Sequence, residues 1–371
     1  MSRPAPPRPS TTVRVRVPAT SANLGPGFDA CGLALGLHDE LTVTVTGPGL
    51  SIEVTGEDDG VRDETHLVVR ALRAGFAAAG TAPAGIRLTC VNRIPHGRGL
   101  GSSAAAIVAG LLAASALGEG CPSIPEVFAL ACGIEGHPDN VAAALYGGFT
   151  VAWYDTDGPP RVARTDPPDD LRPVVFVPAR RQLTAQSRVA LPAGVSHADA
   201  AMNAGRAALL AMVMSGTLRA RPDGACACAC ATASPGLRVP ENHDGAAFGP
   251  VGEHQCCDNR NDYAQPVNNR PAGNQHVRPG AVSWQDALLA AAEDRLHQPY
   301  RLPSMPETRD LLARLRAAGL AAVLSGSGPT VLALAVDRDQ AAVARGCAGS
   351  DFSVLDLPVD RDGAQVEVVA G

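Results

Sequence analysis

The sequence contains no lysine, so all 31 of its basic residues are arginines. This excludes any mechanism that needs a lysine as a general base or as a phosphate ligand. The 37 acidic residues give a formal net charge of −6, and the arginines form no basic block. Such a block is typical of proteins that bind nucleic acids. We therefore expect no nucleic-acid partner.

Aromatic residues are scarce as well. They make up 4% of the chain, of which 46% is hydrophobic, so the cores must consist of Ala, Val and Leu. No apolar run reaches the roughly eighteen residues that span a bilayer. The Pro-rich residues 1–12 lack the apolar segment of a signal peptide. We expect a cytoplasmic protein with no membrane partner, a disordered tail at 1–12 and, from 371 residues, about two domains.

The hydrophobic pattern mixes strands and helices without strict alternation. It predicts strands at 13–17, 40–47, 49–56, 85–95, 147–153, 171–178 and 364–370, and a strand–turn–strand unit at 321–335. It predicts helices at 66–80, 102–118, 123–136, 196–216 and 305–320. Ser123 and Glu126 have the spacing of a capping box, and residues 18–32 are rich in turn formers and predict a loop. This order of elements favours an α+β fold.

Residues 221–282 differ from the rest of the chain. They begin with the low-complexity run "ACACACA" and continue without periodicity to Gly280. We interpret them as a disordered insertion. A zinc site formed by "CACAC", His254 and "CC" is an alternative, but these cysteines lack the usual two-residue spacing. An aberrant stretch of sequence is a further alternative.

The segment "PHGRGLGSSAAA" (residues 95–106) follows a predicted strand and opens a predicted helix. Glycines let the backbone approach a ligand, and the free N–H groups of a helix N-terminus favour an anion. A serine in the first turn can reach a phosphate oxygen or a magnesium ion. The segment lacks the lysine of a Walker loop and is not a dinucleotide fingerprint. The alternative to phosphate binding is a glycine turn before an Ala-rich helix packed on a sheet.

Three further segments carry polar groups in Gly-rich loops. "EGHPDN" holds Glu135, Asp139 and Asn140. Glu135 could complete a magnesium site with a loop serine, whereas Asp139 could instead cap the helix that follows it. "SANLGPGFD" holds Asn23 and Asp29, either in a surface turn or at a small polar substrate. "SGSGPT" (residues 325–330) is a glycine turn between two strands.

Taken together, these four segments resemble, in their order and spacing, the GHMP kinase superfamily over residues 13–220 and 283–335. The forms "ANLGPGFD", "GHPDN" and "DRLHQPYR" (residues 294–301) are similar to those of its homoserine kinase family. The resemblance implies a two-domain α+β GHMP kinase fold. Residues 13–172 would form a ribosomal protein S5 domain 2-like domain that binds ATP. Residues 173–371 would form a ferredoxin-like α/β sandwich that the insertion at 221–282 interrupts.

The resemblance also implies the reaction, which is phosphorylation of the side-chain hydroxyl of L-homoserine with ATP and Mg²⁺ in threonine biosynthesis. Two alternatives stay open. The chain could act on another small alcohol, or it could be an inactive protein of the GHMP kinase fold that only binds ligands. A homodimer is also left open.

The roles of single residues follow from the same resemblance. The ATP phosphates would bind Pro95, His96, Gly97, Arg98, Gly99, Leu100, Gly101, Ser102, Ser103, Ala104 and Ala105. The metal would bind Glu135 and one of Ser102 and Ser103. The substrate would bind Asn23, Asp29, Asp139, Asn140, Thr184, Arg188 and Arg301.

Within the substrate set, Arg188 and Arg301 would clamp the carboxylate, and Asp29 or Asp139 would hold the ammonium group. Asp139 and Asn140 would be the catalytic residues. Relatives in the superfamily pair a lysine with the aspartate, which this chain cannot do. Asp139 would therefore at most orient the hydroxyl, while Mg²⁺ and the helix dipole carry the charge.

Overall fold

The computed structural model describes residues 10–118, 122–156, 158–182, 184–218 and 282–369, and for 184–186 it describes the backbone only. All structural statements below concern these residues. Residues 1–9 of the expected tail, the expected insertion up to residue 281 and its zinc alternative lie outside them. The first strand begins at Thr12.

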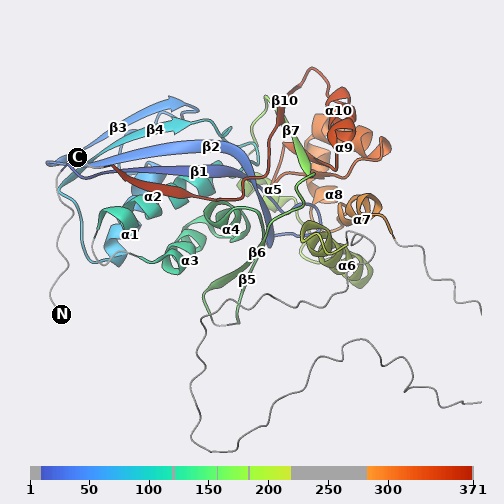
Figure 1. The fold of residues 1–371 in the computed structure, drawn as a ribbon, viewed down its shortest axis with the longest axis horizontal. Coiled ribbons are helices and arrows are strands. Elements are labelled where there is room, and N and C mark those ends of the chain that lie inside the picture. Colours follow the sequence, from blue (N-terminus) through green and yellow to red (C-terminus); the bar gives the residue numbers. More distant parts are fainter. Residues whose placement is uncertain (1–9, 119–121, 157, 183, 219–281, 370–371) are drawn as a thin grey trace, which may run out of the picture. The chain divides into compact units, whose positions relative to one another are not determined.

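One sheet has seven strands and contains both the start and the end of the described chain (Figure 1). They are β1 (Thr12–Ala22), β2 (Cys31–Thr46), β3 (Gly49–Gly56), β4 (Gly85–Asn92), β5 (Phe149–Tyr154), β6 (Pro160–Thr165) and β11 (Gln365–Val369). The order is β11-β1-β2-β4-β3, and β5 pairs with both β2 and β6. Among the described strands of this sheet, only β3 and β4 are parallel. β2 is long enough to pair with β5 through its first residues and with β4 through its last.

The loop predicted at 18–32 is shorter than expected, and its predicted bounds were wrong at both ends. β1 continues to Ala22 and β2 starts at Cys31, which leaves a loop of residues 23–30. The small residues Ala19, Thr20, Ser21 and Ala22 are fully or almost fully buried and pair with β2 after a register shift at Pro18. Proline has no N–H to contribute to a regular ladder, so it is tolerated where the ladder is irregular.

Four helices lie on one face of this sheet (Figure 1). They are α1 (Leu67–Ala78), α2 (Ser102–Leu117), α3 (Ile124–Glu135) and α4 (Asp139–Tyr146). α2 packs against β1 and against the other three helices, which explains why it is apolar on all sides. The capping box of Ser123 and Glu126 at the start of α3 is confirmed.

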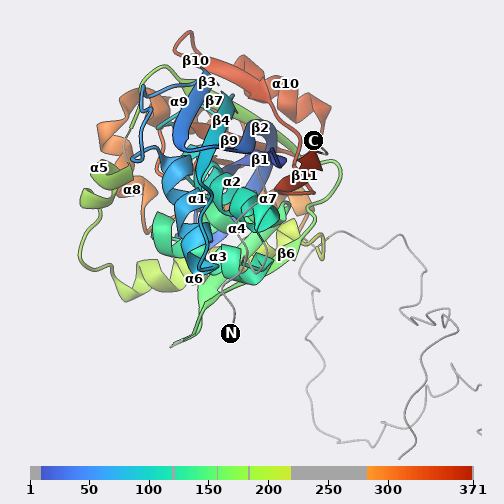
Figure 2. The ribbon, with the colours of Figure 1, turned by 90° about the vertical axis from the view of Figure 1, so that its left-hand side faces the viewer.

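The second sheet has four antiparallel strands in the order β10-β7-β9-β8. They are β7 (Arg172–Pro178), β8 (Ala322–Leu324), β9 (Val331–Ala335) and β10 (Phe352–Asp356). β9 is buried along its whole length. On one side of the sheet, α9 (Pro306–Ala317) and α10 (Arg338–Gly346) share a core with alternate residues of β7 and β9. Figure 2 shows these strands behind the first sheet.

The other alternate residues of β7 and β9 belong to the core that continues under the first sheet, together with α6 (His197–Met214) and α7 (Trp284–Ala291). The described parts of both halves thus form one compact unit. The domain boundary at 172 stays a prediction. The elements that were not predicted from the sequence are β6, β10, α5 (Thr184–Val189), α7, α8 (Gln298–Arg301) and α10. None of the described helices is long and apolar enough to cross a membrane.

The described residues on either side of 219–281 come together in α6 and α7. Trp284 Nε1 donates to the carbonyl oxygen of Val213 at 3.0 Å, and Arg206 Nη2 lies 3.0 Å from Glu293 Oε2. The next elements, α8 (Gln298–Arg301) and the short 3₁₀ helix Leu302–Ser304, follow directly. The packing of α6 against α7 therefore determines where α8 and Arg301 lie.

Candidate active site

The glycine loop (residues 97–101) lies between β4 and α2, with Gly97, Gly99 and Gly101 all at positive φ. Its carbonyl oxygens are turned into the protein. Each accepts a hydrogen bond from elsewhere in the chain. The oxygen of Gly97 accepts from Gln182 N (2.7 Å), that of Arg98 from Thr330 N (3.3 Å), that of Gly99 from Ser325 Oγ (2.7 Å) and that of Leu100 from Thr20 N (3.0 Å). The first N–H groups of α2 have no partner within the helix. The loop and helix start therefore offer N–H donors to an anion.

Two of these glycines also allow the loop to touch its neighbours. A Cβ on Gly101 would overlap with Thr20 Oγ1, and a Cβ on Gly99 would overlap with the carbonyl oxygen of Ser325. A Cβ on Gly97 would meet nothing nearer than 3.6 Å. The sequence "GSGP" at 326–329 and the glycine loop thus pack backbone to backbone.

A cavity of about 240 Å³ opens in front of the loop. It brings together most of the residues that the sequence singled out. Its lining consists of Asn23, Asp29, Gly97, Gly99, Gly101, Ser102, Ser103, Glu135, His137, Asp139, Asn140, Gln182, Arg188, Arg301, Gly326 and Ser327. The acids and arginines predicted for the substrate therefore share one cavity with the predicted phosphate loop.

The other predicted phosphate ligands lie elsewhere. Leu100, Ala104 and Ala105 are buried in the core. The Arg98 side chain points to the end of β7, where it donates to the carbonyl oxygens of Pro178 (3.0 Å) and of the next residue, Ala179 (3.1 Å). Pro95 and Arg98 do not line the cavity, and the side chain of Thr184 lies outside the described residues.

Glu135, His137 and Asp139 form a row at the end of α3 and the start of α4. His137 Nδ1 lies 2.9 Å from Asp139 Oδ1, and its Nε2 lies 4.0 Å from Glu135 Oε1. Burial lowers the pKa of His137, but the hydrogen bond to Asp139 and the charges of both acids outweigh it, so this pKa is raised. Burial also raises the pKa of Glu135. The imidazole was missed from the sequence, although its place between two acids was a usable signal.

Ser103 is the serine that contacts Glu135, with its Oγ donating to Oε1 at 2.6 Å. A hydroxyl and a carboxylate are the hard oxygen donors that Mg²⁺ prefers, and Mg²⁺ usually takes its remaining ligands from phosphates and water. Among the described residues no group of three or more His, Cys, Asp or Glu is arranged to hold a metal. With phosphate oxygens and water as further ligands, the pair fits Mg²⁺.

Asp139 and Asn140 begin α4 and are 2% and 9% exposed. Asp139 is the first residue of the helix rather than its cap, which is Pro138, yet its Oδ1 accepts from Asn140 N at 2.7 Å. It thus satisfies a first-turn N–H and lines the cavity at the same time. Asn140 Oδ1 accepts from Thr20 Oγ1 at 2.7 Å. The two side chains are held from several sides.

The far end of the cavity is built by the loop at 23–30. Asn23 shapes it, with Oδ1 accepting from Asp29 N (2.9 Å) and Nδ2 donating to Gly326 O (2.8 Å). Asp29 and Arg188 form a two-pronged ion pair of 2.8 and 3.1 Å. Arg301 lies behind them and is 1% exposed. The sequence suggested different substrate groups for Asp29 and Arg188, but here they neutralise each other.

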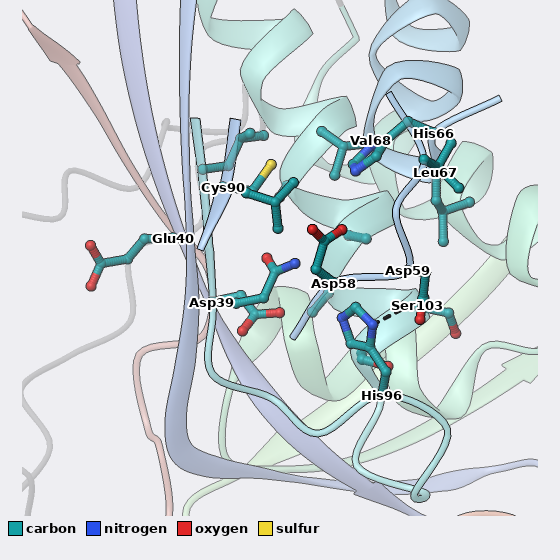
Figure 3. Close-up of a pocket in the computed structure, with 18 of the residues that line it drawn as sticks. Asp39, Glu40, Asp58, Asp59, His66, Leu67, Val68, Cys90, His96 and Ser103 are labelled. Atoms are coloured by element: carbon teal, nitrogen blue, oxygen red, sulfur yellow. Dashed lines mark hydrogen bonds and ion pairs between the residues drawn. The ribbon is translucent and has the colours of Figure 1, made fainter. Parts of the chain in front are cut away.

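A second cavity of about 300 Å³ lies on the other side of the glycine loop and shares Gly97, Ser102 and Ser103 with the first. Its walls are largely apolar and come from residues 39–41, 54–68, 90–97 and α2. Figure 3 shows His66, Cys90 and His96 around it. Nδ1 of His66 has no partner among the described residues, and burial lowers the pKa of this histidine. Outside the motif at 95–106, no motif marks these segments in the sequence.

The family models that match the chain are GHMP kinases N terminal domain, at residues 66–148, and GHMP kinases C terminal, at residues 278–352. The chain is 44% identical over 341 residues to the homoserine kinase of Streptomyces avermitilis, covering 91% of this chain and 90% of that protein. It is 41% identical over 333 residues to that of Clavibacter michiganensis, covering 88% and 84%.

Solved structures show the same fold. The homoserine kinase of Cytophaga hutchinsonii has a TM-score of 0.70 at 22% identity, over 96% of this chain and 97% of that one. The L. major mevalonate kinase, solved with R-mevalonate, has a TM-score of 0.59 at 13% identity, over 97% and 100%.

Proposed function

The chain belongs to the homoserine kinase family of the GHMP kinases, and we propose that it transfers the γ-phosphoryl group of ATP to the side-chain hydroxyl of L-homoserine. The product would be O-phospho-L-homoserine, in threonine biosynthesis. One observation carries the proposal: the phosphate-loop cavity is continuous with a wall of two arginines and two aspartates that suits a small amino acid. A cytoplasmic location and a homodimer stay predictions.

ATP would bind across the two cavities. The apolar cavity at His66 and Cys90 would take the nucleoside, and the triphosphate would lie on the glycine loop, because Gly97, Ser102 and Ser103 line both spaces. Backbone N–H groups then take the place of the absent lysine as phosphate ligands.

Ser103 and Glu135 are the residues that would hold Mg²⁺. When bound, Mg²⁺ would offset the negative charge of the phosphates. Ser103 Oγ already donates a hydrogen bond to the Glu135 carboxylate, so the two oxygen ligands lie side by side before the nucleotide binds.

L-Homoserine is a zwitterion, and the far end of the cavity has a matching pair of charges. The ammonium group would approach Asp29, and the carboxylate would approach Arg188 and the buried Arg301. The ion pair between Asp29 and Arg188 would open to admit the substrate. Because this pair is about 40% exposed, it is weakly bound and can be exchanged at small cost.

The hydroxyl would lie against Asp139 and Asn140, between the amino-acid end and the glycine loop. Phosphoryl transfer through a loose transition state needs alignment and charge stabilisation more than a strong base. His137 fixes the Asp139 carboxylate from one side and the Asn140 N–H fixes it from another. Asp139 would therefore orient the hydroxyl for in-line attack.

The test is ADP release with Mg²⁺, with and without L-homoserine, together with identification of the phosphorylated product. Asp139→Asn keeps the size of the side chain and should lose most of the homoserine-dependent turnover while still binding ATP. Asp351→Asn, on an exposed turn, is the matched control. Turnover with mevalonate or shikimate instead would favour another alcohol, and ATP binding without any turnover would favour an inactive binding protein.

A further inference from the structure

Arg301 is a fully buried cation that the protein holds by one nitrogen. Its Nη1 donates to the carbonyl oxygen of Gly326 and to Nδ1 of His297, both at 3.2 Å. Its guanidinium carbon lies 5.4 Å from the centre of the Phe28 ring. Within the described residues Nε has no partner, although it is buried. The protein thus fixes one corner of the guanidinium, while Arg301 itself lines the cavity.

His297 is completely buried, and its two nitrogens face partners of opposite kind. Nε2 lies 2.9 Å from the carbonyl oxygen of Gly25, which can only accept. Nδ1 faces Nη1 of Arg301, which can only donate. Only a neutral imidazole with its proton on Nε2 satisfies both. A proton on Nδ1 would set two donors against each other, and the imidazolium would in addition place two positive charges side by side.

The charges around His297 come from three directions. Asp294 Oδ2 lies 3.6 Å from Nε2 and also accepts from the backbone N–H of residues 297 and 298, Arg301 faces Nδ1, and Asp29 lies in the loop beyond Gly25. Burial, the largest influence, and Arg301 lower the pKa of His297. The two acids and the hydrogen bond to Gly25 oppose this, and the net direction is down. The neutral form is therefore favoured at neutral pH.

His297 also connects Arg301 to the loop at 23–30. Its ring stacks on Phe28 with centroids 5.3 Å apart, and Phe28 is followed in the chain by Asp29. Gly25, which accepts from the same ring, belongs to the same loop. One side chain thus contacts both parts of the wall that would hold the two charged groups of an amino acid.

We propose that His297 is a positioning residue: its neutral Nε2–H tautomer orients the Arg301 guanidinium toward the substrate carboxylate and fixes it relative to the Asp29 loop. The proposal rests on the proposed function for the identity of the substrate. His297 touches no reacting atom, so its loss should raise the KM for L-homoserine while kcat and the KM for ATP stay within about twofold.

Two substitutions separate the two contacts of the ring. His297→Asn places an oxygen where Nδ1 was and keeps the acceptor for Arg301, but it cannot reach Gly25. His297→Gln reaches Gly25 with its amide nitrogen but offers no acceptor at the Nδ1 position. Hydrogen bonds to charged groups have large effects, so we expect His297→Gln to raise the KM for L-homoserine roughly tenfold or more. His297→Asn should raise it by less than about threefold.

An analogue in which the carboxylate is replaced by an uncharged alcohol provides the control for mechanism. Both variants should use it about as well as the wild type does, because Arg301 then has no carboxylate to hold. Equal effects of the two substitutions on L-homoserine, or a larger effect of His297→Asn, would overturn the proposal and indicate a purely structural tether to Gly25.

The tautomer is measurable without any substrate, by ¹⁵N NMR of the histidine rings in the wild-type protein. His297 should be neutral with its proton on Nε2 at pH 7 and remain so below pH 6.5, the usual pKa. An imidazolium or an Nδ1–H tautomer would refute the proposal even if the variants fail to fold. A wild-type protein with no homoserine-dependent turnover would refute the proposed function, and the NMR result would still decide whether His297 holds Arg301.

Discussion

The glycine loop allows a quantitative test, because two of its glycines have nearly the same backbone angle and different surroundings. Gly97 has φ 64° and Gly101 has φ 72°. An alanine at either position pays for the left-handed conformation, about 1 to 2 kcal/mol. At Gly97 the nearest atom to the new Cβ would be 3.6 Å away, so the conformational cost is the whole expected loss of stability. At Gly101 the new Cβ overlaps with Thr20 Oγ1.

Overpacking of this kind adds about 1 to 3 kcal/mol. Gly101→Ala should therefore lower the free energy of unfolding by at least about 1 kcal/mol more than Gly97→Ala does. The measurement is urea unfolding of the ligand-free proteins. Gly101→Ala should also weaken ATP binding, because relief of the overlap moves the start of α2.

A double mutant identifies the overlap as the cause. Thr20→Ala removes the obstructing oxygen, although it also breaks the 2.7 Å hydrogen bond to Asn140, at about 1 kcal/mol. Gly101→Ala should cost less in the Thr20→Ala background than in the wild type. Equal costs for the two glycines, or strict additivity with Thr20→Ala, would show that the loop does not depend on this contact.

Three further predictions concern the cavity. Asp29→Asn should raise the KM for L-homoserine strongly while lowering the free energy of unfolding by no more than about 1 kcal/mol, because its ion pair is exposed; a large loss in urea unfolding would contradict this. Glu135→Gln should raise the Mg²⁺ concentration needed for half-maximal turnover about tenfold or more, with Glu126→Gln on the same helix as a control outside the cavity. The raised pKa of His137 means that its stabilising contribution is fully present below pH 6.5 and is lost as the pH rises through the folded-state pKa. His137→Gln should therefore be more destabilising at pH 6 than at pH 9, and urea unfolding at both values would show the opposite if the imidazole were held neutral.

The sequence predicted the elements whose patterns have a single physical explanation. The helix at 102–118 is apolar on every side, so it can be stable only when it is buried within the protein. The capping box of α3 depends on two residues three positions apart. β1 was predicted too short because its second half consists of small residues, which resemble a loop until their burial against β2 is known. β6 and β10 are edge strands with mixed exposure, so their patterns are weak.

The candidate site was predictable where its residues lie within one motif. Glu135 and Asp139 lie in one motif and the glycine loop in another, and the two motifs lie together in the structure. The ion pair between Asp29 and Arg188 joins residues 159 positions apart, and no local pattern encodes such a contact. The cavity at His66 and Cys90 is lined by several segments that, outside the motif at 95–106, are each ordinary, so the fold is needed to reveal it.

The pairing of the last strand with the first has a consequence for synthesis on the ribosome. β1 lies between β2 and β11, and the register runs from Thr12 opposite Val369 to Arg16 opposite Gln365. About 340 residues separate these strands, which at ~5 to 20 residues per second takes on the order of half a minute to translate. During that time the outer backbone groups of β1 are an open edge that can pair with another nascent chain. Loss of residues 365–369 would make this exposure permanent, and its effect would be seen first in aggregation during expression.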